Sequence, residues 1–165
     1  VDSSQAKLDE LMTAYGSNNV EYILSSEESI QSSINESDLV IGSVYVVGKE
    51  APKVITKEML SSMSPGTVMV DVSIDQGGCF ETSKPTTHDN PTFLENDIVH
   101  YCVTNMPGAV PLTATEALNK VTLSYIDKLA NNGISNALNS DIHLKNGLNM
   151  QSGKIVHPGV IEALS

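Results

Sequence analysis

The sequence predicts an α/β fold in which a parallel sheet is flanked by helices. Between Gln5 and Thr104, segments with helical spacing of apolar residues alternate with short β-branched segments. This alternation is typical of crossover connections on a parallel sheet. One segment, residues 68–74 (VMVDVSI), is almost continuously apolar. That composition indicates a strand buried on both faces.

The spacing of apolar residues gives the expected elements. We expect helices at Gln5–Tyr15, Glu27–Asn35, 56–63 and 114–131, and strands at 20–24, 38–47, 68–74 and 98–104. Residues 79–96 are polar and rich in turn formers, so we expect a long loop there. After residue 133 we expect a short helix, a hairpin around residues 151–153 and a last helical turn at 158–164.

The ends of several helices carry recognisable signals. Ser3 or Ser4 is expected to cap the first helix, and Gly16 to end it. Thr56 is expected to cap the third helix, with Met59 and Met63 facing the core. Thr113 or Thr115 is expected to cap the long helix, which Gly133 then ends.

Composition narrows the classes of function. The 165 residues suffice for a proper core. The net charge is −11, with nine lysines and no arginine, which argues against nucleic acid or an anionic membrane as partner. No apolar run is long enough for a membrane span, and no signal peptide pattern opens the chain. Cys79, Cys102 and the four histidines lack metal-site spacing, so we expect no metal and two buried thiols in a reducing cytoplasm.

Three predicted strands end in small or polar residues: 42–43 and onward to 48–49, then 75–78, then 105–108. In a parallel sheet such ends share one edge, where open α/β sheets bind nucleotides. On pattern alone, Asp75-Gln76-Gly77-Gly78 could equally form an ordinary turn. The phosphate-binding turn GxGxxG is absent, as is the strand–helix–strand unit that carries it. The chain therefore resembles the second half of a Rossmann-type domain, with Asp2 interpreted as a helix-entry residue.

Long motifs then resemble those of a known family. Residues 71–83 (DVSIDQGGCFETS), 85–88 (PTTH) and 100–111 (HYCVTNMPGAVP) closely resemble alanine dehydrogenases. Residues 37–42 (SDLVIG) and 51–53 (APK) fit the same family in order and spacing, and the resemblance runs from about Val1 to Leu164. Transhydrogenase subunits share the fold, but the run IDQGGCFETS favours alanine dehydrogenase. Leu112 departs from the family, which usually has a basic residue there.

The resemblance implies two parts of a larger protein. Residues 1–112 would be the C-terminal half of an NAD-binding Rossmann domain, and residues 113–165 a linking helix and the C-terminal helical segment of the substrate domain. The implied function is reversible oxidative deamination of L-alanine to pyruvate and ammonia. The family's phosphate loop and its substrate-holding Arg, Lys and His belong to an N-terminal part that this chain lacks. We therefore expect the chain to be inactive alone, to need that part as partner, and to form homo-oligomers, which are hexamers in the family.

The resemblance also implies the site. Asp75 matches the catalytic carboxylate beside the nicotinamide of NAD. The residues that match cofactor-binding positions follow the strand ends: Ser25, Val44, Tyr45, Val72, Ser73, Ile74, Asp75, Val103, Thr104, Asn105 and Met106. Several of these are apolar, so packing in the protein and backbone contact with the cofactor can coexist. Tyr45 is expected to form a wall and not to bind directly.

Two alternatives remain open from the sequence. The chain could be a non-catalytic module that binds nucleotides or supports oligomerisation. It could also belong to a related transhydrogenase or a lysine-pathway dehydrogenase on the same scaffold.

Overall fold

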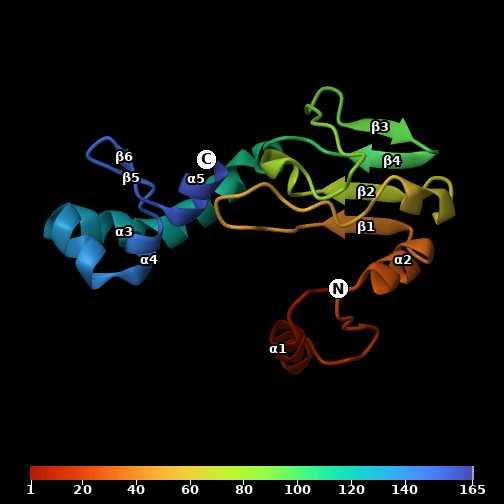
Figure 1. Ribbon diagram of the computed structural model, residues 1–165, viewed down its shortest axis with the longest axis horizontal. Helices are drawn as coiled ribbons and strands as arrows, with labels where there is room; N and C mark the ends of the chain where they lie inside the picture. Colours follow the sequence, from red (N-terminus) through yellow and green to blue (C-terminus); the bar gives the residue numbers. More distant parts are fainter. Residues whose placement is uncertain (165) are drawn as a thin grey trace. The chain divides into compact units, whose positions relative to one another are not determined.

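Three parallel strands and one antiparallel edge strand form the main sheet of the computed structural model, which describes residues 1–164. The strands are β1 (Leu39–Gly42), β2 (Val68–Asp71), β3 (Thr92–Glu95) and β4 (Ile98–Tyr101). Their order is β1-β2-β4-β3, and β3 runs opposite to its neighbour β4 (Figure 1). The predicted α/β class with a parallel sheet is confirmed. Strand β3 was not predicted, because it lies in the segment interpreted as a loop.

The chain forms two compact units. The first contains Val1–Tyr45 and Ala51–Thr104, and the second contains Val46–Glu50 and the residues from Asn105 onward. The main sheet belongs to the first unit. The predicted division at residue 112 concerns domains of a complete protein and stays a prediction.

Helices α1 (Gln5–Tyr15) and α2 (Glu27–Asn35) have the predicted bounds. Ser4 begins α1, since its Oγ accepts a hydrogen bond from the Lys7 N–H, and Gly16 ends it. Helix α2 begins with reciprocal hydrogen bonds between Ser26 and Ser29, whose side chains each accept from the other's backbone N–H. Both caps satisfy amide groups that have no partner inside the helix.

Two predicted elements of the first unit are wrong in type. Residues 20–24 form no strand, because the backbone pairing of this segment is a single bridge between Leu24 and Asp2. Residues 56–63 contain a 3-10 helix, η1 (Glu58–Ser62), and not an α-helix. It begins after Lys57 without a side-chain cap, so the predicted Thr56 cap is also wrong. The hydroxyls of Ser61 and Ser62 donate to backbone carbonyls within η1, which competes with regular helix formation.

The three predicted strands that do form, at 38–47, 68–74 and 98–104, are shorter than predicted. Strand β2 ends at Asp71, and a 3-10 turn, η2 (Ile74–Gln76), follows. The cause is the Asp71 carboxylate, which accepts a hydrogen bond from the Ser73 N–H at 3.0 Å and bends the chain away from the ladder. Strand β1 ends at Gly42 and strand β4 at Tyr101.

The core of the first unit lies on one face of the sheet. Met69 and Ile98 on that face are fully buried against Leu60 and Phe80, among others. Met59 and Met63 join this core, as predicted. The side chains that point to the other face stay partly or largely exposed: Leu39 (54%), Ile41 (61%), Leu94 (68%), and the half-buried Val68 and Val70. The described residues cover only one face of β2. The prediction that β2 is buried on both faces is therefore wrong for the part of the chain that the structure describes.

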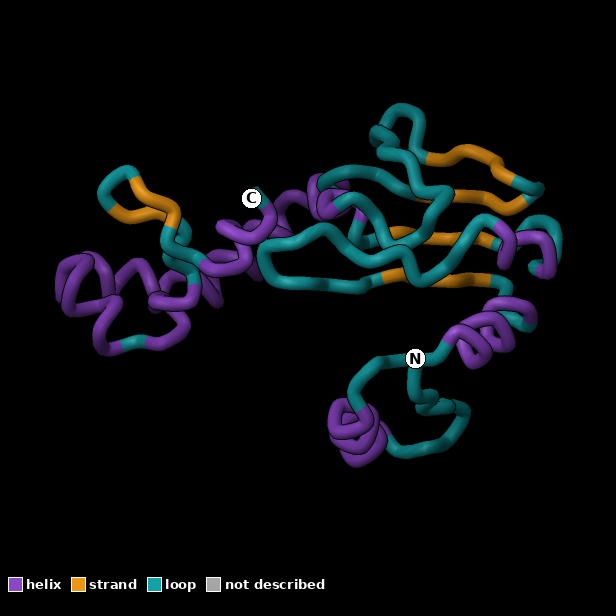
Figure 2. The backbone as a smooth tube through the Cα atoms, in the orientation of Figure 1, coloured by secondary structure: helices purple, strands orange, loops and turns teal. Residues whose placement is uncertain are grey.

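The second unit is mainly helical (Figure 2). It contains η3 (Met106–Ala109), α3 (Pro111–Ser140), α4 (Ile142–Asn146), a hairpin of β5 (Met150–Gln151) and β6 (Lys154–Ile155), and α5 (Pro158–Ala163). The hairpin and the last helical turn were predicted.

Helix α3 begins at Pro111, three residues before the predicted start, and no side chain caps it. Gly133 is non-helical, with φ 73° and ψ 161°, so it interrupts α3 where the sequence predicted an end. In the part of the chain that the structure describes, no helix combines the length and apolarity needed to cross a membrane.

Candidate functional site

The candidate residues of the first unit, except Ser25, gather at one edge of the sheet. Because β1, β2 and β4 are parallel, their carboxyl ends lie at the same edge. Residues 44–45 follow β1, residues 72–75 follow β2, and residues 103–104 follow β4. The Ser73 hydroxyl donates to the Val44 carbonyl at 2.8 Å, which joins the first two segments directly. We call this set the carboxyl edge.

A buried carboxylate organises the turn after β2. Asp71 is 0% exposed. Its Oδ2 accepts hydrogen bonds from the Cys79 N–H (2.8 Å), the Phe80 N–H (3.3 Å) and the Ser83 hydroxyl (2.5 Å). Its Oδ1 accepts from the Ser73 N–H. A buried carboxylate needs such partners, and here they close residues 72–78 into a compact loop, the Asp75 turn.

Asp75 sits on the outer side of this loop. It lies in η2 and is exposed, whereas its neighbour Ile74 is buried. Gly78 completes the turn with φ +77°, and a Cβ there would lie 2.8 Å from Asp71 Oδ2. A side chain at this position would be strained and would collide with the carboxylate that closes the loop.

The other candidates of the edge differ in what they can offer a ligand. Ser73, Ile74 and Val103 are buried, so only their backbone could contact a ligand, and the Ser73 N–H and carbonyl already form hydrogen bonds within the turn. Val72 is 48% exposed and Tyr45 66% exposed, so their side chains are available to pack against an aromatic ring.

Three predicted residues lie outside this edge. Ser25 follows the residue that bridges to Asp2, and its N–H donates to the Asp2 carbonyl at 2.9 Å. Asn105 and Met106 belong to the second unit, where Asn105 has left-handed backbone angles and precedes η3. Their part in a shared site stays a prediction.

Burial favours the neutral forms of Cys79, Cys102 and His100 in the first unit. Burial, and then the nearby Asp71 carboxylate, raise the pKa of the Cys79 thiol to about 11, so it stays protonated and donates to Asp71. Burial likewise raises the pKa of Cys102. Burial lowers the pKa of His100. Since its Nδ1 faces the Ile98 carbonyl, that nitrogen carries the proton and Nε2 accepts from the Thr82 hydroxyl at 2.8 Å.

Sequence reasoning missed two residues that shape the Asp75 turn. Asp71 was noted only as part of a motif, although a carboxylate inside an apolar strand is itself a signal of a buried polar network. Lys53 was likewise noted only within the APK motif. Its ammonium group donates to the carbonyls of Gly77 and of Gly78, the latter at 2.7 Å. Nothing in the sequence predicts these two contacts, which span 24 and 25 residues.

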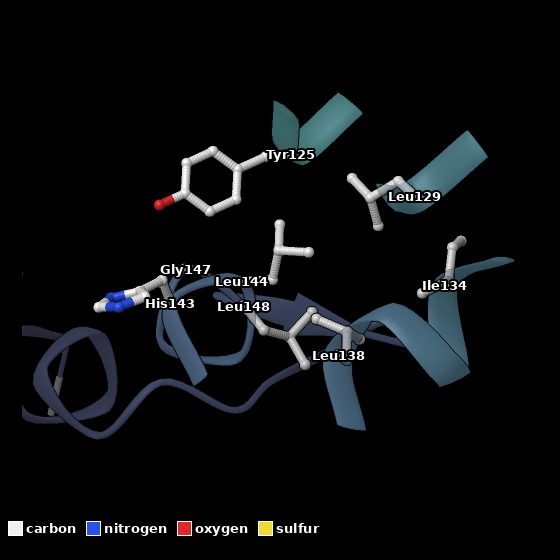
Figure 3. A pocket seen from close by; sticks show the side chains of 8 residues that line it. All are labelled: Tyr125, Leu129, Ile134, Leu138, His143, Leu144, Gly147 and Leu148. Atoms are coloured by element: carbon white, nitrogen blue, oxygen red, sulfur yellow. The ribbon is translucent and has the colours of Figure 1, made fainter. Parts of the chain in front are cut away.

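A separate pocket of about 550 Å³ occurs in the second unit. In Figure 3, Tyr125 and Leu129 of α3 lie on one side of it and Leu138 and Leu144 on the other. The remaining lining residues are Ile134, His143, Gly147 and Leu148. None of the predicted site residues lines this pocket, so it is not the predicted cofactor site.

The carboxyl edge fits one part of a dinucleotide. Exposed aliphatic surface at Val72, the backbone N–H of Ile74 and the Asp75 carboxylate suit a flat, electron-poor ring with an attached sugar. The chain has no glycine-rich turn to bind the phosphates. These residues could therefore hold the nicotinamide side of a cofactor whose phosphates are bound elsewhere.

A parallel sheet with polar residues after its strand ends is the architecture on which many α/β proteins bind nucleotides at the carboxyl edge. The profile of the family described as "Alanine dehydrogenase/PNT, C-terminal domain" matches residues 1–158. The chain belongs to this family, which confirms the resemblance inferred from its motifs.

Individual relatives agree. The chain is 48% identical over 163 residues to an alanine dehydrogenase of Halomonas elongata, covering 99% of this chain and 44% of that protein. It is 46% identical over 159 residues to an alanine dehydrogenase of Staphylococcus haemolyticus, covering 96% of this chain and 42% of that protein. The chain thus spans less than half the length of these relatives.

Solved structures give the same result for the fold. A structure of an L-alanine dehydrogenase superposes with a TM-score of 0.81 at 45% identity, covering 99% of this chain and 46% of that one. A transhydrogenase from Sinorhizobium meliloti superposes with a TM-score of 0.68 at 20% identity, covering 95% of this chain and 41% of that one. The second likeness shows a shared fold alone.

Proposed function

We propose that this chain is the C-terminal part of an NAD-dependent L-alanine dehydrogenase, which converts L-alanine and water to pyruvate and ammonium with reduction of NAD. The observation that carries the proposal is the exposed Asp75 carboxylate on a fixed turn at the carboxyl edge. This turn lies within the motif that the sequence shares with alanine dehydrogenases, and its relatives carry that name.

Asp75 supplies the electrostatic part of the chemistry. When bound, NAD accepts the hydride from the substrate carbon. As that hydride leaves, the carbon–nitrogen bond of alanine gains double-bond character and positive charge grows on nitrogen. An ionised carboxylate fixed beside this nitrogen stabilises the growing charge, and it can orient the water that attacks the carbon next.

The other candidate residues, inside and outside the carboxyl edge, orient the cofactor in this proposal. Val72 and the backbone of residues 73–74 would contact the nicotinamide end, together with residues 103–104 and with Asn105 and Met106. Val44 and Tyr45 would lie nearer the adenosine, with Ser25 near the adenine. Backbone contacts suit the positions whose side chains are buried in the core.

The proposal includes a partner for the apolar surface that each unit exposes. In the first unit this surface is the uncovered sheet face, with Leu39, Ile41 and Leu94. In the second unit, α3 exposes a further set: Leu112, Leu118, Val121, Leu123 and Ile126. Exposed apolar surface of this kind favours association. We propose that the remaining part of the protein covers it and supplies the phosphate-binding turn and the substrate-holding groups, in a cytoplasmic homo-oligomer.

The test is an assay of the full-length protein. We expect NADH formation with L-alanine, none with L-lysine, and little with NADP in place of NAD. Activity with lysine, or transhydrogenation without alanine turnover, would contradict the assignment. The isolated chain 1–165 should show no turnover under the same conditions, and activity of that chain would refute the claim that it is incomplete.

A further inference from the structure

The Asp75 turn is held from two sides by residues that the proposed reaction does not yet use. We propose that Asp71 and Lys53 are positioning residues, which fix the backbone of residues 72–78 and so fix the place of the Asp75 carboxylate. This inference rests on the proposed function and deepens it.

On the inner side, Asp71 binds amide groups at both ends of the turn. It accepts from the Ser73 N–H at the start and from the Cys79 and Phe80 N–H groups at the end. The Ser83 hydroxyl donates a hydrogen bond to the same carboxylate at 2.5 Å. Because Asp71 is fully buried at the end of β2, these bonds anchor the turn to the sheet.

On the outer side, Lys53 binds carbonyl groups of the same turn. Its ammonium donates to the carbonyls of Gly77 and Gly78. The segment that carries Lys53 is itself aligned with the turn, since Ala51 N–H donates to the Gln76 carbonyl (2.9 Å) and Val54 N–H to the Cys79 carbonyl (2.8 Å). These two backbone hydrogen bonds therefore place Lys53 next to the turn.

Asp75 depends on this support because of its own location. It lies in a 3-10 turn of three residues, and such short turns have poor hydrogen-bond geometry. It is also exposed, so burial of its side chain does not fix it. A displacement of about 1 Å at a reacting group can lower a rate about a hundredfold. The hydrogen bonds made by Asp71 and Lys53 limit the displacement of Asp75.

The sharpest variant is Lys53→Met in the full-length protein. Methionine keeps most of the aliphatic length and removes the ammonium, and Lys53 is exposed, so no buried charge is left unpaired. We expect kcat to fall at least tenfold with the melting temperature nearly unchanged, while the KM for NAD can rise because residues 72–74 of the same turn contact the cofactor. Lys53→Arg, which keeps the charge and the donors, should recover most of the lost rate.

Lys57→Met is the matched control. Lys57 is an exposed lysine of the same unit whose ammonium pairs at 2.9 Å with Glu95 of β3, which is not part of the Asp75 turn. This variant should leave kcat at the wild-type value. A wild-type kcat in Lys53→Met, or an equal loss in Lys57→Met, would overturn the proposal.

A double variant distinguishes positioning from general support of the fold. If Lys53 acts through Asp75, adding Lys53→Met to Asp75→Asn should lower kcat no further. A further tenfold loss in the double variant would show that Lys53 does not act through Asp75.

Hydrogen exchange tests the hold independently of the substrate. In the full-length protein, the peptide that spans residues 72–80 should exchange faster in Lys53→Met, and faster again in Asp71→Asn if that variant folds. An unchanged hydrogen-exchange rate of residues 72–80 in Lys53→Met would refute the proposal that Lys53 fixes the turn. A wild-type protein that does not oxidise alanine would instead refute the proposed function, so the two failures are distinguishable.

Discussion

The turn that follows β2 has a buried side and an exposed side, and the two differ in what their residues do. On the buried side, Asp71 and Cys79 are 0% exposed and Phe80 is 1% exposed. On the exposed side, Val72 is 48% exposed and Asp75 is open to solvent. A stretch of ten residues therefore contains both the anchor of a local core and the candidate reactive carboxylate.

Residues that stabilise the fold and residues that serve the reaction can therefore be told apart within one motif. Substitutions on the buried side should change the free energy of unfolding, because they remove packing or hydrogen bonds. Substitutions on the exposed side should change turnover and leave the fold intact.

The largest effect on stability is expected for Phe80→Ala. Phe80 is a central core residue, and truncating a buried phenylalanine costs about 3–5 kcal/mol of unfolding free energy. Val72→Ala, eight residues earlier on the exposed side, should cost about 0.5 kcal/mol or less. Urea unfolding of the two variants measures both values. Equal losses would show that the turn has no distinct buried and exposed sides.

A smaller loss is expected for Gly42→Ala at the end of β1. A Cβ at residue 42 would lie 2.4 Å from Cys79 Sγ and 2.5 Å from Phe80 Cζ, so the two segments approach too closely for any side chain. Such overpacking typically costs about 1–3 kcal/mol. The control is Gly147→Ala in the second unit, where the nearest atom is 3.5 Å away and little change is expected. A stability gain in Gly42→Ala would contradict the close approach.

The smallest effect concerns pH. Burial holds the pKa of His100 below its ordinary value of about 6.5 in the folded protein. Below that pH the unfolded chain binds a proton that the folded chain does not, so this residue's contribution to stability is present above about pH 6.5 and is lost as the pH falls. The slope of unfolding free energy against pH should flatten in His100→Gln below about pH 6.5. An unchanged slope in His100→Gln would show that the loss of unfolding free energy at low pH comes from other groups.

Much of the fold could be predicted from local patterns. Ser26 and Ser29 at the start of α2, and Gly16 after α1, act through neighbours within a few residues, and both helices have their predicted bounds. The sheet edge could be predicted because parallel strands align their ends, whatever the lengths of the strands. The motif at residues 71–83 correctly indicated the family.

What could not be predicted depends on contacts between distant residues. The end of β2 at Asp71 results from a carboxylate that binds amides up to nine residues further on. Strand β3 exists because residues 92–95 pair with β4, and the polar character of the surrounding loop concealed it. The exposure of one sheet face could not be predicted, since a strand covered on both faces in a complete protein has the same sequence. Lys53 and its carbonyl partners show the same limit for the site.

The most direct test of the account is Asp75→Asn in the full-length protein. The amide has the size of the carboxylate but no charge, and Asp75 is exposed, so the melting temperature should stay within a degree or two of wild type, as expected for a surface change. If the carboxylate stabilises the growing positive charge, kcat for alanine should fall by about 100- to 1,000-fold. A variant whose melting temperature falls well below that of wild type, or one that keeps the wild-type kcat, would contradict the assignment of Asp75 as the catalytic carboxylate.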